Sequence, residues 1–232
     1  MKNKEIIKLL NEICDLIAMN LQNILALRYD ISIKKDGTPV TKSDLLLESI
    51  VLSYIEERIP NAIFISEESY NTIKDKEVAS SYLILLDPID GTENFCSGLV
   101  EWGVSLGVWQ GTTHIGSLLF FPEMGIRLVT GDRIKPIQSR IIGLSSSMAD
   151  SVIEKLREVG EYRIMGCAAY NIYNVIRGAF GRFINPKGAY VWDLLPGIML
   201  ALEHGCSVKV NEKEFAGEFL DPSKLYRVEI QR

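Results

Sequence analysis

The sequence predicts an α+β protein in which helices come first, a mostly antiparallel sheet follows, and strands and helices then alternate. Apolar residues recur at helical spacing over residues 3–28, and the period of the pattern then changes to that of strands. After Ser145 strand-like and helix-like segments alternate. The junction lies near residue 140, so we expect a packed N-terminal α+β subdomain, 1–140, and a C-terminal α/β subdomain, 141–232.

The first two helices are separated by a turn. Residues 3–28 form an amphipathic pattern, and Asp36-Gly37 with Pro39 marks a turn behind it. Thr41 to Asp44 has the form of a capping box, which predicts that a second helix begins there. We expect Pro60 to end that helix.

Short apolar runs bounded by turn residues predict six strands after the second helix. These are AIFIS (62–66), YLILL (82–86), GVSLGVW (103–109), HIGSLLFF (114–121), IRLVT (126–130) and IIGLS (141–145). The alternating half then predicts a helix over 149–159, a strand over 162–165, a helix over 168–177, a strand over 182–184 and a helix over 192–204.

The composition is that of a globular protein, with 47% hydrophobic and 24% charged residues among 232. The net charge of −5 argues against a nucleic-acid polymer or an anionic membrane as partner. Glu5, Glu12 and Asp15 interrupt the first helix, so we expect neither a signal peptide nor a membrane anchor. Four scattered cysteines without a C-x-x-C pair disfavour zinc and fit a reducing compartment. We therefore predict a cytoplasmic protein.

Two aspartates stand close together behind an apolar strand. Asp87 and Asp90 follow the 82–86 strand, separated by Pro88 and Ile89, and Gly91 permits a sharp turn after them. Two unpaired carboxylates at this spacing repel each other, and a divalent cation removes the conflict. Mg²⁺ prefers oxygen ligands, so the Ile89 carbonyl is a further candidate ligand. An ordinary Asp-Gly surface turn is the alternative.

Other acids stand at the ends of predicted elements. Glu67 and Glu68 close the strand before, Asp193 opens the last helix, and Asp44 lies at the start of the second helix. Helix capping explains Asp44 and Asp193 when each is taken singly. Their joint appearance with D-P-I-D-G-T favours a metal site.

Two known motifs do not match that hexapeptide. An EF-hand loop would need oxygen ligands where Leu86 and Pro88 stand. The haloacid dehalogenase phosphatases use D-x-D-G-T with a covalent aspartate, and this chain has one residue more between its aspartates.

A third match fits over most of the chain. The stretch D-P-I-D-G-T-E-N-F at 87–95 resembles the inositol monophosphatase family, within the lithium-sensitive, metal-dependent sugar and nucleotide phosphatases. The supporting motifs follow in the family's order: P-V-T-x-S-D (39–44), S-E-E-S (66–69), G-C-A-A-Y-N (166–171) and W-D-x-x-P-G (192–197). The resemblance implies a layered α-β-α-β-α sandwich of the sugar phosphatase type and a homodimer.

The resemblance also implies ligands for two to three Mg²⁺ ions. It places one ion between Glu67, Asp87 and the Ile89 carbonyl, and a second among Asp87, Asp90 and Asp193. Glu67 thereby counts among the catalytic residues as well.

Catalytic and substrate-binding residues follow from the same resemblance. Asp44 and Thr92 match the pair that orients and deprotonates the attacking water. The amides of Gly91 and Thr92 would receive the phosphate. Further substrate contacts are implied at Gly166, Cys167 and Ala168.

The chain departs from the family near the substrate's alcohol. Inositol-specific members carry a glutamate six residues before the Trp-Asp pair, where this chain has Pro186 followed by Lys187. A donor-only lysine there favours an additional anionic group on the substrate. Lys34 or Lys35 could close over the site from residues 31–39, although a solvated charge pair explains either lysine equally well.

The resulting hypothesis is a Mg²⁺-dependent phosphatase. It would hydrolyse a small phosphate monoester, such as inositol monophosphate, by direct attack of a metal-activated water. A 3′(2′),5′-bisphosphate nucleotidase is the alternative within the superfamily. A non-catalytic descendant that binds a phosphorylated metabolite is the alternative of another class. The sequence leaves open the substrate, the lithium sensitivity and the number of metals bound at rest.

Overall fold

The computed structural model describes residues 3–35, 37–70, 82–146 and 160–232, together with residues 150, 153 and 156. The helix predicted for residues 149–159 therefore lies largely outside the described residues. Within the described part, no helix combines the length and the apolar character that a bilayer span requires.

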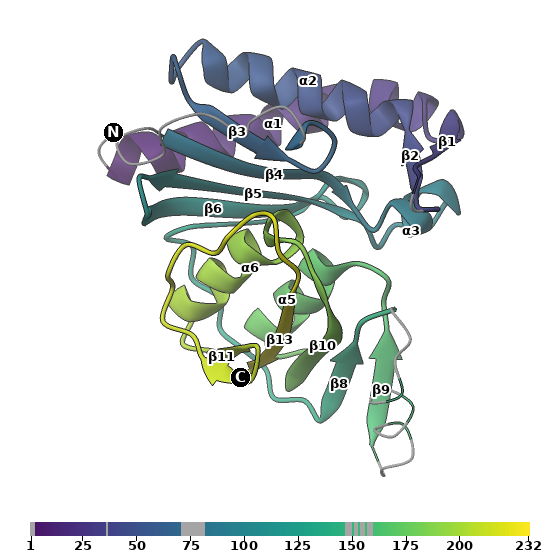
Figure 1. Ribbon diagram of the computed structural model, residues 1–232, viewed down its shortest axis with the longest axis vertical. Helices are drawn as coiled ribbons and strands as arrows, with labels where there is room; N and C mark the ends of the chain where they lie inside the picture. The colour runs from purple at the N-terminus through teal and green to yellow at the C-terminus, as the bar shows by residue number, and fades with distance from the viewer. Residues whose placement is uncertain are drawn as a thin grey trace.

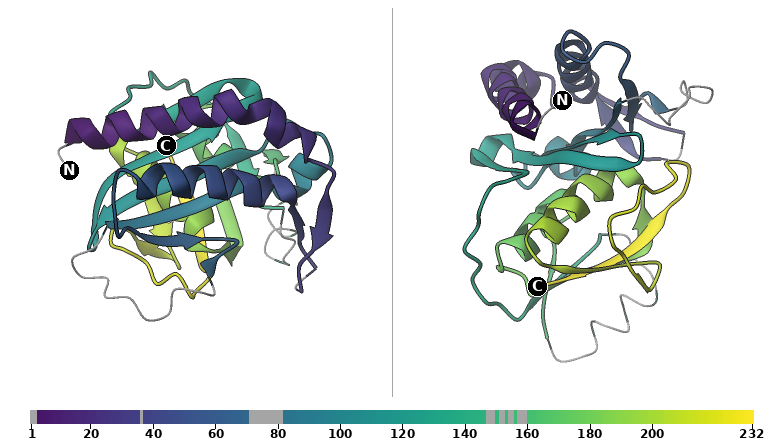
Figure 2. Two further views of the ribbon diagram at one scale, coloured as in Figure 1. Left: turned by 90° about the horizontal axis from the view of Figure 1, so that it is seen from above. Right: turned by 90° about the vertical axis from the view of Figure 1, so that its left-hand side faces the viewer.

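The chain folds into stacked layers of helices and sheets (Figure 1). Helices α1 (Asn3–Ala26) and α2 (Lys42–Glu56) run side by side over the outer face of a five-stranded sheet (Figure 2). Helices α5 (Ala168–Ile176) and α6 (Val191–Glu203) lie between this sheet and a six-stranded one. The predicted α+β class with layered helices and sheets is confirmed.

The first sheet has the strand order β3-β4-β5-β6-β7, with β3 and β4 parallel and the other pairs antiparallel. Its strands are β3 (Ile63–Ser66), β4 (Tyr82–Asp90), β5 (Gly103–Gln110), β6 (Thr113–Phe121) and β7 (Ile126–Val129). This agrees with the mostly antiparallel sheet predicted. The short helices α3 (Thr92–Cys96) and η2 (Pro122–Met124), both absent from the sequence prediction, follow β4 and β6.

The second sheet has the order β12-β11-β13-β10-β8-β9. Its strands are β8 (Ile141–Leu144), β9 (Glu161–Ile164), β10 (Arg182–Ala189), β11 (Ser207–Val210), β12 (Lys213–Glu214) and β13 (Tyr226–Gln231). Strands β8, β9 and β10 are parallel, as an alternating strand–helix half requires, whereas β13 inserts between β10 and β11. The boundary predicted at residue 140 falls between β7 and β8.

Strand β4 is buried on both faces, as its apolar run predicts. Leu83 and Leu85 pack toward α5 and α6, while Ile84 and Leu86 pack toward α1 and α2, and all four are fully buried. Burial of each such side chain stabilises the fold by about 1.5–3 kcal/mol. The strand is thus a rigid support for whatever stands at its end.

Two local predictions need correction. Strand β4 does not stop before Asp87 but continues to Asp90, pairing with β5 on either side of a register shift that accommodates Pro88. Helix α2 ends at Glu56, so Pro60 does not set its end. The turn predicted after the first helix is present, and it joins two strands that were not predicted, β1 (Ile31–Ile33) and β2 (Pro39–Thr41).

Candidate metal centre

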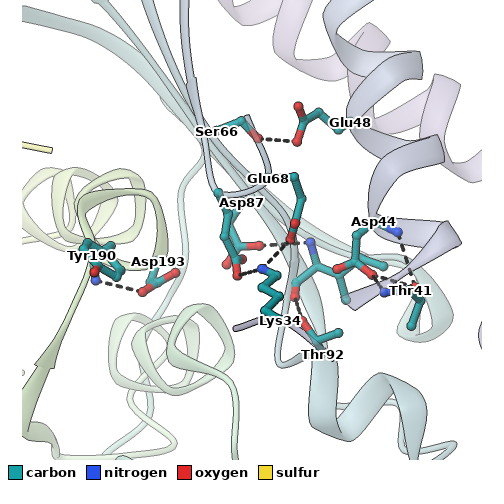
Figure 3. A network of polar contacts seen from close by, with 12 residues as sticks. Lys34, Thr41, Asp44, Glu48, Ser66, Glu68, Asp87, Thr92, Tyr190 and Asp193 are labelled. Carbon is teal, nitrogen blue, oxygen red and sulfur yellow. Dashed lines mark hydrogen bonds and ion pairs between the residues drawn. The ribbon is translucent and has the colours of Figure 1, made fainter. Parts of the chain in front are cut away.

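Three carboxylates from different elements meet at one point. Glu67 follows β3, Asp87 lies in β4, and Asp193 stands in the first turn of α6. One ligand oxygen from each lies within 4.8 Å of the others. We call Glu67, Asp87 and Asp193 the carboxylate cluster. Figure 3 shows Asp193 reaching toward it from α6, opposite Asp87.

Local structure fixes how these acids point. The parallel pairing of β3 with β4 brings the C-terminal ends of both strands to one edge of the sheet. The backbone N–H of Ile89 donates to Asp87 Oδ1 at 3.0 Å, and that of Tyr190 donates to Asp193 Oδ2 at 2.9 Å. Each carboxylate therefore keeps one oxygen tied to its own backbone.

The electrostatics of the site disfavour charged carboxylates. Burial, and then the neighbouring Glu67, Asp90 and Asp193, raise the pKa of Asp87 well above its usual range. Burial and the acids Glu67 and Asp90 likewise raise the pKa of Asp193. Like charges gathered in a poorly solvated site attract a cation.

Asp90 has a structural contact besides its predicted role as ligand. Its Oδ2 accepts hydrogen bonds from the Ala169 N–H and from Cys167 Sγ, the latter at 3.2 Å. Burial raises the pKa of Asp90 to about 6, while these two donors hold it lower than burial alone would. One oxygen of Asp90 thus anchors the first turn of α5 beneath the site.

Asp44 and Thr92 do not hydrogen-bond to each other; each bonds to a different residue. Asp44 is fully buried, and its Oδ2 closes a capping box with Thr41 N (2.8 Å) and Thr41 Oγ1 (2.5 Å). Its Oδ1 is buried without a hydrogen-bond partner. The Thr92 hydroxyl donates to the Ile89 carbonyl oxygen at 3.0 Å rather than to Asp44. A buried carboxylate oxygen without a donor is costly, so a ligand is expected there.

Two glycines allow the substrate-side loops to meet. Gly91 has φ +87°, and a Cβ on it would lie 3.0 Å from Cys167 Cβ. Gly166 has φ +71°, and a Cβ there would lie 2.6 Å from Asn94 Oδ1. The Asn94 amide donates to the carbonyls of Glu101 and Met165, at 2.7 Å each. The structure thus brings Gly91, Gly166 and Cys167 together beside Asp90.

A cavity of about 130 Å³ opens next to this loop contact. Asp90 and Asp193 line it together with Gly166, Cys167 and Ala168, and the neutral side chains of Ser145, Asn171 and Asn185 complete its polar wall. Lys187 is exposed on β10 and does not line this cavity.

Lys34 stands inside the site. Its Nζ lies 2.6 Å from Glu67 Oε1 and 2.7 Å from Glu68 Oε1 (Figure 3). Burial lowers the pKa of Lys34, but Glu67 and Glu68 raise it by more, so the ammonium stays charged. The structure thus selects Lys34 from the two lysines that the sequence analysis considered for closing over the site. The sequence could not indicate its partner, because nothing in the residues near Lys34 shows which acid, 33 residues further on, it meets.

The residues present fit a magnesium site. The cluster offers only carboxylate oxygens, which are hard ligands that Mg²⁺ prefers over zinc-type nitrogen and sulfur sets. The buried Asp44 Oδ1 has no hydrogen-bond donor, and the pKa values of Asp87 and Asp193 are raised, so added positive charge would stabilise these carboxylates.

Comparisons with known proteins point the same way. Residues 3–140 match the sequence profile of the Inositol monophosphatase family. The Nus factor SuhB of Vibrio cholerae is 28% identical over 231 residues, which cover 87% of this chain and 80% of that protein. A fructose-1,6-bisphosphatase/inositol-1-monophosphatase of Thermotoga maritima is 28% identical over 201 residues, covering 77% and 74%.

Among solved structures, a staphylococcal inositol monophosphatase-1 superposes with a TM-score of 0.83 at 18% sequence identity. The alignment covers all of this chain and 91% of that one. This likeness concerns the fold.

Proposed function

The chain belongs to the inositol monophosphatase family, and from that premise we propose that it is a Mg²⁺-dependent phosphatase acting on a small phosphate monoester. Members of this family that resemble the chain are phosphatases, and the family is metal-dependent. The observation that supports the proposal most is the meeting of Glu67, Asp87 and Asp193 within 4.8 Å.

We assign the cation ligands to the cluster and its neighbours. Glu67, Asp87 and the Ile89 carbonyl would hold one ion, and Asp87, Asp90 and Asp193 a second. When bound, Mg²⁺ would supply positive charge against the phosphoryl oxygens and lower the pKa of the attacking water. Two strands and one helix hold these ligands, so the geometry is preorganised.

The chain's own residues would handle the proton of the attacking water. The Thr92 hydroxyl donates its proton to the Ile89 carbonyl, so its oxygen can still accept a hydrogen bond from the attacking water. Asp44 Oδ1 has no partner, and burial raises the pKa of this carboxyl group while Thr41 opposes the rise. A carboxylate with a raised pKa is a stronger base than an ordinary one, so Asp44 is suited to accept a proton. The amides of Gly91 and Thr92 would orient the phosphate.

The alcohol part of the substrate would enter the cavity beside Asp90 and Asp193. The neutral wall of that cavity, with Ser145, Asn171 and Asn185, supports a hydroxyl-bearing alcohol such as inositol. The bisphosphate alternative requires a second anion site, and exposed Lys187 stays the candidate for it. The fructose-1,6-bisphosphatase/inositol-1-monophosphatase relative keeps a sugar bisphosphate among the substrates to test.

A phosphate-release panel with Mg²⁺ tests the proposal. It should contain inositol 1-phosphate, fructose 1,6-bisphosphate, adenosine 3′,5′-bisphosphate and histidinol phosphate. We expect release from inositol 1-phosphate and a loss of about 10²–10³-fold or more in Asp193→Asn, whose amide oxygen can still accept from Tyr190 N. Asp15→Asn removes an exposed ion pair with Arg127 and serves as the matched control.

Each outcome decides between the candidates. Release from the adenosine bisphosphate alone, reduced by Lys187→Met, would favour the nucleotidase. Mg²⁺ binding without release from any substrate would favour the non-catalytic descendant. Cytoplasmic location and a homodimer stay predictions, which cell fractionation and sedimentation would check.

A further inference from the structure

The bridging position of Lys34 is not explained by the assigned ligands or by the water-activating pair. Its ammonium contacts Glu67, an acid of the carboxylate cluster, and equally Glu68, an acid outside that cluster. Two N–O distances of 2.6 and 2.7 Å are in the range of strong, charge-assisted hydrogen bonds. One internal cation therefore joins the metal centre to a neighbouring acid (Figure 3).

This ion pair is shielded from solvent. The side chains of Lys34, Glu67 and Glu68 are 22%, 25% and 9% exposed. Salt screens partly buried pairs less than exposed ones, so the contact is stronger than a surface salt bridge. Lys34 thus neutralises part of the charge that the cluster acids impose on one another.

The segment that carries Lys34 is lightly attached elsewhere. Strands β1 and β2 form a sheet of their own, with Ile31 and Ile33 exposed. An isolated two-stranded hairpin has little stability by itself. The Lys34 N–H donates to the Thr38 carbonyl at 2.8 Å, which places the main chain of Lys34 at the turn of the hairpin. A shift of Nζ by a few ångströms therefore disturbs little packing.

We propose that Lys34 is a built-in counter-ion of the carboxylate cluster that competes with the divalent cation for Glu67. When the cation binds Glu67, Glu68 retains the ammonium, so Lys34 moves aside without leaving its second acceptor. The inference rests on the proposed metal site and assigns functions to Lys34 and Glu68 that the phosphatase mechanism does not require. Its consequence is a weaker repulsion among the cluster acids in the absence of metal, and a lower affinity for Mg²⁺ than the acids alone would have.

Calorimetric titration of the full chain with Mg²⁺ alone tests this competition. Lys34→Met should bind Mg²⁺ about tenfold more tightly than the wild type, which corresponds to about 1.4 kcal/mol. Lys35→Met removes the same charge from the adjacent, exposed position and should change the affinity less than about twofold, as expected for a screened surface charge. Equal gains in both variants would overturn the proposal, since charge alone would then suffice.

A double-mutant cycle tests the retaining function of Glu68. Glu68→Gln should weaken Mg²⁺ binding in the wild-type background, because Lys34 then loses its second acceptor and stays on Glu67. In the Lys34→Met background the same substitution should have almost no effect. Additive effects would refute the retention by Glu68.

Hydrogen exchange adds a readout that does not depend on activity. Mg²⁺ should speed hydrogen exchange at the Lys34 ammonium in the wild type, because the ammonium then keeps only Glu68 as its acceptor. Unchanged exchange in the wild type on saturation would contradict the displacement. If the wild type binds no Mg²⁺ at all, the proposed function fails as well. If it binds Mg²⁺ and Lys34→Met binds with the same affinity, only the counter-ion inference fails.

Discussion

At the scale of single residues, Asp87 lowers the stability of the metal-free protein but is needed for the proposed metal binding. Its pKa is raised because burial and then the neighbouring acids Glu67, Asp90, Asp193 and Asp44 disfavour the carboxylate, so its charge destabilises the metal-free fold. Asp87→Asn removes that charge, and the amide oxygen can still accept from Ile89 N. In chelator at pH 8 we expect the variant to have a higher urea midpoint than the wild type, with activity in Mg²⁺ lowered about 10²–10³-fold or more.

Saturating Mg²⁺ should reverse this order of stability, because only the wild type retains the full ligand set. Asp15→Asn, an exposed acid, should leave both midpoints close to those of the wild type. A variant less stable than the wild type in chelator would contradict the repulsion among the cluster acids.

His114 gives a second, independent prediction at this scale. Burial lowers its pKa from 6.5 to about 4, with the ring nitrogen Nε2 2.7 Å from Ser117 Oγ and the ring packed against Trp109. Since the folded pKa lies below the unfolded one, the unfolded chain binds more protons between these values. The stability that neutral His114 confers is thus fully present above pH 6.5 and is lost as the pH falls toward 4.

Between pH 7 and pH 5 this loss amounts to about 2 kcal/mol. Urea unfolding at both pH values, in the wild type and in His114→Gln, separates this loss from the effects of Asp87 and Asp193, whose raised pKa values act with the opposite sign. Equal pH dependence in the two proteins would show that His114 does not titrate as described.

At the scale of elements, a buried hydrogen bond ties α2 to the end of β3. Ser66 is fully buried, and its hydroxyl donates to Glu48 Oε2 at 2.7 Å (Figure 3). Glu48 lies one helical turn after Asp44, and Ser66 directly precedes Glu67. The bond therefore helps to fix the distance between Asp44, the proposed base, and the carboxylate cluster.

Ser66→Ala removes that donor and leaves a buried carboxylate without it. We expect the free energy of unfolding to fall by about 1.5–3 kcal/mol, the usual worth of a hydrogen bond to a charged group. Ser49→Ala, on the exposed face of the same helix, should change it by less than about 0.5 kcal/mol. Urea denaturation of both variants measures the difference, and equal stabilities would contradict a stabilising hydrogen bond between Ser66 and Glu48.

The same scale shows how far sequence patterns reach. The apolar run of β4, the capping box at Thr41 and the helical periods of α1, α5 and α6 are local signals, and the structure has those elements at nearly the predicted residues. The continuation of β4 through Pro88 was missed, because proline usually ends a strand and only the register shift opposite β5 accommodates it. Strands β11 to β13 were missed because they follow the last clear periodic pattern.

In the candidate site, too, the sequence indicated some features and not others. The motif order predicted which acids to consider, and the structure brings Glu67, Asp87 and Asp193 together. The contacts of Lys34 with Glu68 and of Asp90 with Ala169 depend on how distant segments pack, so no local pattern could indicate them. The placement of Lys187 outside the cavity has the same origin, since a register shift in β10 directs that stretch.

At the scale of the whole molecule, the cation should stabilise the fold. A ligand that binds only the native state adds about 2.7 kcal/mol at a hundred times its dissociation constant. For a chain of this size that corresponds to roughly 5–10 °C in the midpoint of thermal unfolding. Calorimetric scans in chelator and in saturating Mg²⁺ measure the shift, with Ca²⁺ and Na⁺ at matched ionic strength as controls. No shift with Mg²⁺ would contradict a site built from the cluster.

Asp193 is separated from Asp87 by about a hundred residues, in the half of the chain that folds last during N-to-C-terminal synthesis. Without α6, the sheet that carries Asp87 lacks part of the cover of its inner face, and the cluster lacks its third acid. Complete metal binding consequently requires that both halves of the chain have folded. A chain truncated before α6 would therefore carry the D-P-I-D-G-T motif without a complete carboxylate cluster.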